Sequence, residues 1–143
     1  MILILFTDPE SYRVVSRKLF LSIFKILKKV ILVEDDSDTV GVVDIILKDA
    51  GFLVININRQ LPVEEVAAIK PDLVIVDFLL PFGLGNELCA ELKSHPKTKD
   101  IPVILYSANY LAPKLAEDCK ADAFIPKPFD IDDFVNTVKR FAN

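Results

Sequence analysis

The chain alternates short apolar runs, rich in β-branched residues, with longer segments whose apolar residues recur at helical spacing. The apolar runs predict buried strands, because β-branched side chains favour a pleated surface. The longer segments predict helices bounded by Asp, Ser, Pro or Gly. The predicted strands are 30–34, 52–57, 72–78, 101–106 and 123–126. The predicted helices are 38–50, 62–69, 86–94, 110–118 and 131–141.

Five strands that alternate with five helices predict an α/β fold, a doubly wound parallel sheet with helices on both faces and right-handed crossovers. In such open sheets, ligands bind at the carboxyl ends of the strands, where the strand order reverses. We therefore expect the polar residues that end or follow the strands to share one edge. These residues are Glu34, Asp35, Asp77, Ser107 and Lys127.

Composition limits the class of protein. A length of 143 residues predicts one domain with a sizeable core. The net charge of −4 argues against nucleic acid as the main partner. The longest candidate membrane stretch, 19–33, is interrupted by lysines, and no secretory signal precedes it, so we expect no membrane span and a cytoplasmic location. Cys89 and Cys119 lack metal-ligand spacing and are predicted to be reduced core thiols.

The N-terminal segment differs from the rest. Residues 1–29 contain six Lys or Arg and two acids, whereas the other 114 residues contain eleven and nineteen. Asp8-Pro9-Glu10 is a typical helix start, and an amphipathic basic helix is predicted over 9–28. It could pack on the domain, pair with a second copy in a homodimer, or lie on an anionic membrane surface; packing or pairing is favoured. We therefore divide the chain into an extension, 1–28, and a domain, 29–143.

The predicted edge has the composition of a metal and phosphate site. Carboxylates without His or Cys ligands suit a hard cation, and Mg²⁺ is the expected one. Lys127 and Ser107 would complement phosphoryl oxygens. An aspartate facing this pocket could act as a nucleophile and hold an acyl phosphate. A cis bond between Lys127 and Pro128 would aim the lysine inward.

Four motifs occur in register: ILVEDD, DLVIVDFLLPFGLGNEL, IPVILYSAN and AFIPKPF. With this order and spacing, residues 29–143 resemble the receiver domain of a two-component response regulator. The resemblance implies a flavodoxin-like sheet with strand order 2-1-3-4-5. It also implies the site roles. Asp77 would be the phosphoacceptor. Asp35, Asp77 and the Leu79 carbonyl would hold Mg²⁺, and Glu34 would be an acid of the metal site that acts through water. Ser107 would be the switch hydroxyl, Lys127 the phosphate-pairing lysine, Pro128 the cis-proline and Phe124 the switch aromatic.

This sequence departs from the receiver pattern at three positions. Glu34 stands where many members have Asp, which lengthens the side chain by one carbon. Phe124 replaces a frequent Tyr, so no hydroxyl is present there. Leu84 stands where an acid is usual, but it is not one of the ligands that the resemblance implies.

The resemblance implies a phosphorelay function. A sensor histidine kinase or histidine phosphotransfer protein would donate the phosphoryl group, and the fourth helix, fifth strand and fifth helix of the domain would then contact a downstream protein. Such a domain catalyses its own phosphorylation and hydrolysis but is not an enzyme that turns over a metabolite. Because nothing follows the last predicted helix, we expect a stand-alone receiver.

Two alternatives stay open. Asp36-Ser37-Asp38-Thr39-Val40 matches the D-x-D-x-T/V motif of haloacid-dehalogenase-like phosphatases, which also use an Asp nucleophile and Mg²⁺. That interpretation gives Asp77 no role, and the acidic pair Asp132-Asp133 falls within the last predicted helix. A receiver-like module that no longer takes phosphate is the second, although the complete set of site residues argues against it. A calcium loop starting at Asp36 is excluded, because Val40 and Leu47 cannot chelate.

Overall fold

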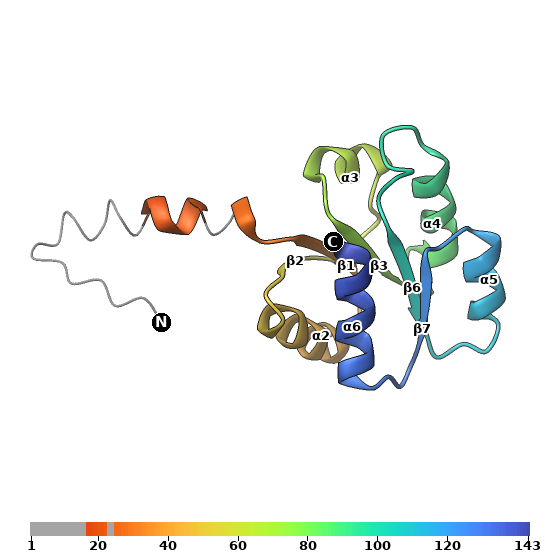
Figure 1. Cartoon of the computed structure of the whole chain (residues 1–143). Helices are drawn as coiled ribbons and strands as arrows, with labels where there is room; N and C mark the ends of the chain where they lie inside the picture. The colour runs from red at the N-terminus through yellow and green to blue at the C-terminus, as the bar shows by residue number, and fades with distance from the viewer. Residues whose placement is uncertain (1–16, 23–24) are drawn as a thin grey trace, which may run out of the picture.

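A five-stranded parallel sheet forms the centre of the molecule in the computed structural model, which describes residues 17–22 and 25–143 (Figure 1). Its strands lie in the order β2-β1-β3-β6-β7, and all neighbouring pairs are parallel. This is the order 2-1-3-4-5 when the strands of this sheet are numbered alone, so the predicted sheet is confirmed. The bounds are β1 (Lys29–Val33), β2 (Leu53–Ile57), β3 (Leu73–Asp77), β6 (Val103–Ser107) and β7 (Ala123–Pro126).

Helices cover both faces of the sheet, as the doubly wound fold requires. Two helices pack on one face and three on the other. The first pair is α2 (Ser37–Asp49) and α6 (Ile131–Ala142), and the other three are α3 (Val63–Ile69), α4 (Gly85–Ser94) and α5 (Ala112–Asp118).

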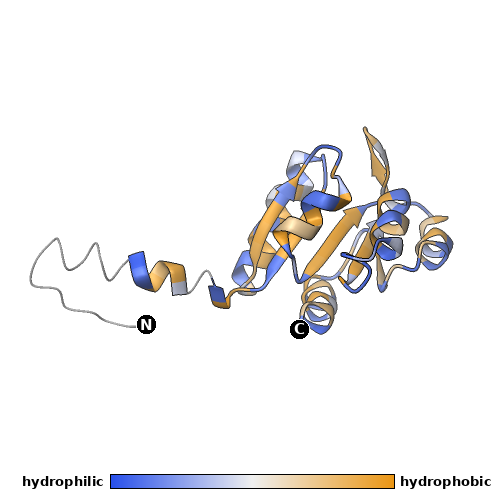
Figure 2. Ribbon diagram, turned by 90° about the horizontal axis from the view of Figure 1, so that it is seen from above, coloured by the Kyte–Doolittle hydropathy of each residue, from blue (hydrophilic) through white to orange (hydrophobic). Residues whose placement is uncertain are grey.

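The central strands are buried on both sides. In β1, Val30 and Leu32 belong to the core beneath α2 and α6, whereas Ile31 and Val33 belong to the core beneath the other three helices. All four side chains are fully buried. Figure 2 shows the same arrangement as hydrophobic strands between helices of mixed hydropathy. Burial on both faces explains why the strands appear in the sequence as continuous apolar runs.

Local side-chain contacts set the ends of the helices. The Asp36 carboxylate accepts the Thr39 N–H (2.8 Å) and caps α2. The helix expected from residue 110 begins two residues later, because the Asn109 side chain accepts the Leu111 N–H (2.9 Å) and holds a turn there. The segment after β3, predicted as a loop, contains a short antiparallel hairpin of β4 (Leu79–Leu80) and β5 (Gly83–Leu84).

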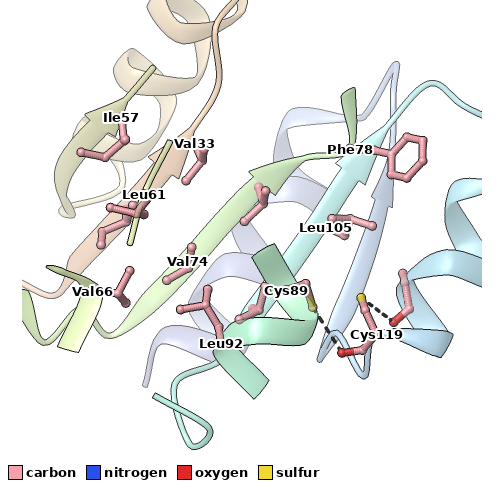
Figure 3. Packing of buried hydrophobic residues seen from close by; sticks show 14 of the residues in the cluster. Val33, Ile57, Leu61, Val66, Val74, Phe78, Cys89, Leu92, Leu105 and Cys119 are labelled. Carbon is pink, nitrogen blue, oxygen red and sulfur yellow. Dashed lines mark hydrogen bonds between the residues drawn. The ribbon is translucent and has the colours of Figure 1, made fainter. Parts of the chain in front are cut away.

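The two cysteines lie in the core beneath α4 and α5 (Figure 3). Both are free and buried, which confirms the prediction of core thiols. The Cys89 thiol donates to the Cys119 carbonyl (3.5 Å), and the Cys119 thiol donates to the Ala116 carbonyl (3.3 Å). Burial raises the pKa of Cys89 well above its ordinary value, so this sulfur stays protonated.

Residues 17–22 and 25–28 extend away from the sheet in Figure 1. Residues 17–22 and 25–26 are helical, in agreement with part of the helix predicted over 9–28. The prediction is wrong at residues 27–28, which are not helical, because the Lys28 carbonyl accepts the Leu53 N–H (2.9 Å) where pairing with β2 begins. The rest of that prediction, at 9–16 and 23–24, lies outside the described residues. Leu21 is 51% exposed and Ile26 is 78% exposed. Packing of this helix on the domain is therefore not observed at these positions.

No helix in the described part of the chain combines the length and the apolar character needed to cross a bilayer.

Candidate functional site

The polar residues predicted at the strand ends lie together at the carboxyl edge of the sheet. Backbone hydrogen bonds between strands continue to this edge, where the Glu34 N–H donates to the Ile57 carbonyl (3.2 Å) and the Lys127 N–H donates to the Ser107 carbonyl (2.9 Å). These bonds fix the positions from which the site side chains project. The residues brought together are Glu34, Asp35, Asp77, Ser107 and Lys127.

Three carboxylates at this edge form a group able to hold a metal ion. One oxygen from each of Glu34, Asp35 and Asp77 lies within 4.8 Å of the others. Glu34 is buried, Asp77 is partly buried and Asp35 is exposed, so solvent reaches the group. An all-oxygen donor set with access for water fits a hard cation such as Mg²⁺, which usually keeps several waters in its shell.

Glu34 is anchored by four hydrogen bonds. One carboxylate oxygen accepts the N–H groups of Asp35 (3.1 Å) and Asp36 (3.0 Å). The other oxygen accepts the Tyr106 hydroxyl and the Lys127 ammonium group (3.1 Å). Because each oxygen accepts two of these bonds, the carboxylate is held in one orientation. Glu34 therefore serves as a fixed negative charge beside the other two acids.

The pKa values of Glu34 and Asp77 are shifted in opposite directions. Burial favours the neutral form of Glu34, but hydrogen bonds from Tyr106, the Asp36 N–H and Lys127 outweigh it and lower the pKa of Glu34. Burial is also the largest influence on Asp77; together with the like charge of Glu34, it outweighs the attraction of Lys127 and raises the pKa of Asp77 to about 6. A cation bound at this edge would favour the charged form of Asp77.

Lys127 places a positive charge against both acids. Its Nζ lies 3.1 Å from Oε2 of Glu34 and 3.5 Å from Oδ2 of Asp77. The same ammonium group lies 4.0 Å from the centroid of the Tyr106 ring, which adds a cation–π contact. The Lys127–Pro128 peptide bond is cis, the geometry that the resemblance implies.

A hollow of about 440 Å³ adjoins Asp77. Ser107 is buried, and its hydroxyl oxygen accepts the Asn109 N–H (3.0 Å), so its hydrogen can still be donated to a group in the hollow. Phe124 does not line this hollow; it is partly buried against the core beneath α3, α4 and α5. The lining residues are Asp77, Leu79, Ser107, Ala108, Asn109, Tyr110 and Lys127.

The acids of the phosphatase-like motif lie at the start of α2. Both the N–H and the hydroxyl of Thr39 donate to Asp36, which caps α2. Asp38 lies exposed in the first turn of the same helix. Asp132 and Asp133 occupy the first turn of α6. These positions suit acids that stabilise helix starts through the macrodipole.

Tyr106 is a site residue whose role the sequence pattern did not reveal. It is fully buried, and its hydroxyl donates to Glu34. Its burial beside that carboxylate raises the pKa of Tyr106, which keeps the hydroxyl a donor. The available signal was a tyrosine inside an otherwise apolar strand, since a buried tyrosine hydroxyl needs a partner.

The Tyr106→Phe variant is expected to unfold with a free energy about 1–3 kcal/mol lower than that of the wild type, because a buried, charged acceptor on Glu34 loses a donor. Urea titration followed by circular dichroism measures the difference. Tyr110→Phe is the matched control, since Tyr110 is 87% exposed and its hydroxyl should contribute nothing measurable. Equal stability of the two variants would contradict the anchoring role of Tyr106.

Comparison with known families agrees with this arrangement. The family model of the response regulator receiver domain matches residues 30–139, which is most of the chain. The chain belongs to this family. Receiver domains are signalling modules, and the matched residues include every strand end that contributes to the candidate site.

Several curated relatives of this receiver are transcriptional regulators. It is 32% identical over 120 residues to the phosphate regulon transcriptional regulatory protein PhoB of Pseudomonas aeruginosa, a match covering 78% of this chain and 50% of that protein. It is 28% identical over 116 residues to the DNA-binding dual master transcriptional regulator RpaA of Synechocystis, covering 79% and 48%. The chain spans about half the length of these curated relatives.

Solved receiver structures share the fold. A putative response regulator from Chloroflexus aurantiacus superposes with a TM-score of 0.74 at 26% identity, covering 81% of this chain and 98% of that one. The signal receiver domain of a histidine kinase from Syntrophus aciditrophicus has a TM-score of 0.69 at 29% identity, covering 80% and 89%.

Proposed function

We propose that this receiver accepts a phosphoryl group on Asp77 in a Mg²⁺-dependent reaction and signals through altered protein contacts. One observation carries the proposal. The Asp77 carboxylate adjoins a hollow of about 440 Å³, has Lys127 at 3.5 Å and belongs to a group of three carboxylates within 4.8 Å. A nucleophile, a cation and a metal-binding acid set are the groups that phosphoryl transfer needs at one point.

In the proposed reaction, a carboxylate oxygen of Asp77 attacks the phosphorus of a phosphohistidine on a sensor histidine kinase or phosphotransfer protein. The new O–P bond forms as the N–P bond breaks, and its electron pair stays on the imidazole nitrogen. Bound Mg²⁺, held by Asp35, Asp77 and the Leu79 backbone carbonyl with Glu34 beside it, would supply positive charge for the phosphoryl oxygens. Water later hydrolyses the acyl phosphate.

Lys127 and Ser107 are the proposed sensors of the phosphoryl group. Lys127 already lies 3.5 Å from the acceptor carboxylate, and its contact with Glu34 would weaken as it pairs with a phosphoryl oxygen. The Ser107 hydroxyl would donate to another oxygen, and the backbone bond between Lys127 and Ser107 couples the two movements. Phe124 lies on β7 beside β6 and would repack in response.

The proposed output surface comprises α5, β7 and α6, the elements that follow Ser107 and flank Lys127. Tyr110 and Leu111, just before α5, are 87% and 52% exposed, which gives this surface an apolar part. A phosphoryl-dependent change in affinity for a protein partner is a two-state equilibrium biased by local charge. Residues 29–143 would form this switch, with residues 1–28 as an extension.

The test is incubation of the full chain with acetyl phosphate. We expect the intact mass to rise by one phosphoryl group with Mg²⁺ and to stay unchanged with EDTA. Hydroxylamine should release the phosphate from an acyl phosphate and leave a hydroxamate at the acceptor aspartate. Asp36→Asn is the control and should be modified like the wild type. A haloacid-dehalogenase-like phosphatase would instead turn over a small phosphate ester and lose that activity in Asp36→Asn, a result that would overturn the proposal.

A further inference from the structure

A basic and apolar surface lies at the end of the sheet opposite to the candidate site. All strands of the parallel sheet begin at this end, and the N-terminal segment joins the domain at Lys29, the first residue of β1. We call residues 17–22 and 25–29 the basic segment. The sequence has no acidic residue between Glu10 and Glu34. The cationic residues of the basic segment are Arg17, Lys18, Lys25, Lys28 and Lys29.

The domain extends this positive surface. A hollow of about 410 Å³ lies between residues 25–29 and the Lys70–Asp72 turn, and Lys70 also lines a neighbouring hollow with Lys97. Asp72 is the acid among these lining residues. It is engaged by the basic segment itself, because it accepts the Lys29 N–H (2.7 Å) and lies 3.8 Å from the Lys28 ammonium group. The surface therefore keeps an excess of positive charge.

Apolar side chains share this surface with the lysines. Leu19, Leu21 and Ile26 are 39%, 51% and 78% exposed, although each is large and hydrophobic. Figure 2 shows the hydrophobic part of helix 17–22 lying apart from the domain. Exposed leucine and isoleucine flanked by lysine and arginine are typical of helices that lie in the interface of a lipid bilayer.

We infer that the basic segment and the adjoining lysines of the domain bind an anionic membrane surface. Leu21 and Ile26 would enter the headgroup boundary, while the exposed cationic side chains of Arg17, Lys18 and Lys25 would face lipid phosphates. Charge favours this occupant over a second copy of the chain. Two copies meeting through this surface would bring two sets of positive charges against each other, whereas an anionic bilayer offers both opposite charge and an apolar layer.

This mode of binding leaves the candidate site accessible. The parallel strands run from the basic segment to the carboxyl edge of the sheet. A membrane bound at the basic segment therefore lies away from Asp35 and Asp77, which are at the carboxyl edge. The acids of that edge would also be repelled by anionic lipid, which favours the same orientation. The inference does not depend on phosphoryl transfer, because none of the residues of this surface belongs to the candidate site.

The test is co-sedimentation of the full chain with large unilamellar vesicles. We expect binding to vesicles of phosphatidylcholine with about one-third phosphatidylglycerol and little binding to phosphatidylcholine alone. Raising the ionic strength from about 0.1 M to about 1 M should weaken binding at least tenfold, because the screening length falls from about 10 Å to about 3 Å.

Two double variants test the two parts of the surface. Lys18→Gln with Lys25→Gln should weaken binding about thirtyfold, the effect of about 1 kcal/mol for each lysine near an anionic surface. Leu21→Gln with Ile26→Gln should also weaken it at least tenfold. Each variant has a matched control that replaces exposed residues of α2 and α5 and should bind like the wild type. Lys48→Gln with Lys114→Gln is the control for the lysines, and Val42→Gln with Ile45→Gln is the control for the apolar residues.

Three results would overturn the inference. The first is no association with the anionic vesicles at low salt. The second is equal association with neutral vesicles. The third is a dimer in light scattering that becomes a monomer in Leu21→Gln/Ile26→Gln while vesicle binding is absent, because this result would assign the surface to a second copy of the chain.

Discussion

The Asp77→Asn variant is expected to lose the reaction with acetyl phosphate and to be more stable than the wild type at neutral pH. Loss of reaction follows because an amide cannot form the acyl phosphate. The gain in stability follows because the Asp77 side chain is only 14% exposed and its charge faces Glu34, which together raise its pKa to about 6. Allowing for the lost contact with Lys127, we expect a gain of about 1–2 kcal/mol.

The gain in stability should depend on pH with a defined sign. A carboxyl whose folded-state pKa is raised destabilises the fold fully above that pKa, and the penalty disappears below the unfolded value. For Asp77 these values are about 6 and 3.8. The difference between variant and wild type should therefore be fully present at pH 7.5, decrease as the pH falls below about 6, and vanish only below pH 3.8.

Urea titrations of both proteins at several pH values, without Mg²⁺, measure this difference. Asp38→Asn is the control, because Asp38 is an exposed acid in the first turn of α2 and should not reproduce the pH-dependent gain. A stability difference independent of pH, or of the opposite sign, would mean that the charge of Asp77 is not costly in the fold.

Replacing Gly85 with alanine is expected to destabilise the fold by about 3 kcal/mol. A Cβ atom at this position would lie 2.9 Å from the carbonyl carbon of Asp77, 2.9 Å from Cγ1 of Val76, and closer still to the Asp77 carbonyl oxygen. The backbone cannot easily move away, because the Gly85 N–H donates to the Phe78 carbonyl (2.8 Å) at the start of α4. Overpacking against backbone atoms has costs of this order.

Gly41→Ala provides a matched control for the same substitution. Gly41 lies exposed within α2, and a Cβ atom added there would meet no heavy atom within 4 Å beyond the neighbouring backbone of its own helix. Alanine there should stabilise the fold by about 0.5–1 kcal/mol, since glycine is a poor helix former. The two urea midpoints should thus move in opposite directions. A Gly85→Ala protein as stable as the wild type would refute the close approach of α4 to the end of β3.

Much of the fold was predictable, because the sheet is buried on both faces. Apolar runs such as 30–33 and 73–76 have no polar interruption, so they could be recognised as strands without knowledge of their partners. The rule for ligand binding in parallel sheets then predicted that Asp77 and Lys127 lie at one edge, although fifty residues separate them in the sequence.

The remaining features depend on contacts that periodicity does not encode. The β4–β5 hairpin has strands of two residues, too short for an alternating pattern. The role of Tyr106 depends on which face of β6 it occupies and on the reach of Glu34 across β3. The requirement for glycine at position 85 appears only when α4 is placed against the Asp77 carbonyl.

The most direct test of the central claim identifies the residue that carries the phosphoryl group. After brief reaction with acetyl phosphate and Mg²⁺, borohydride reduces an aspartyl phosphate to homoserine, which peptide mass spectrometry locates. We predict homoserine at position 77 of the wild-type chain and none when EDTA replaces Mg²⁺. Homoserine at Asp36 or Asp35, or its absence from every aspartate, would contradict the assignment of Asp77 as the phosphoacceptor.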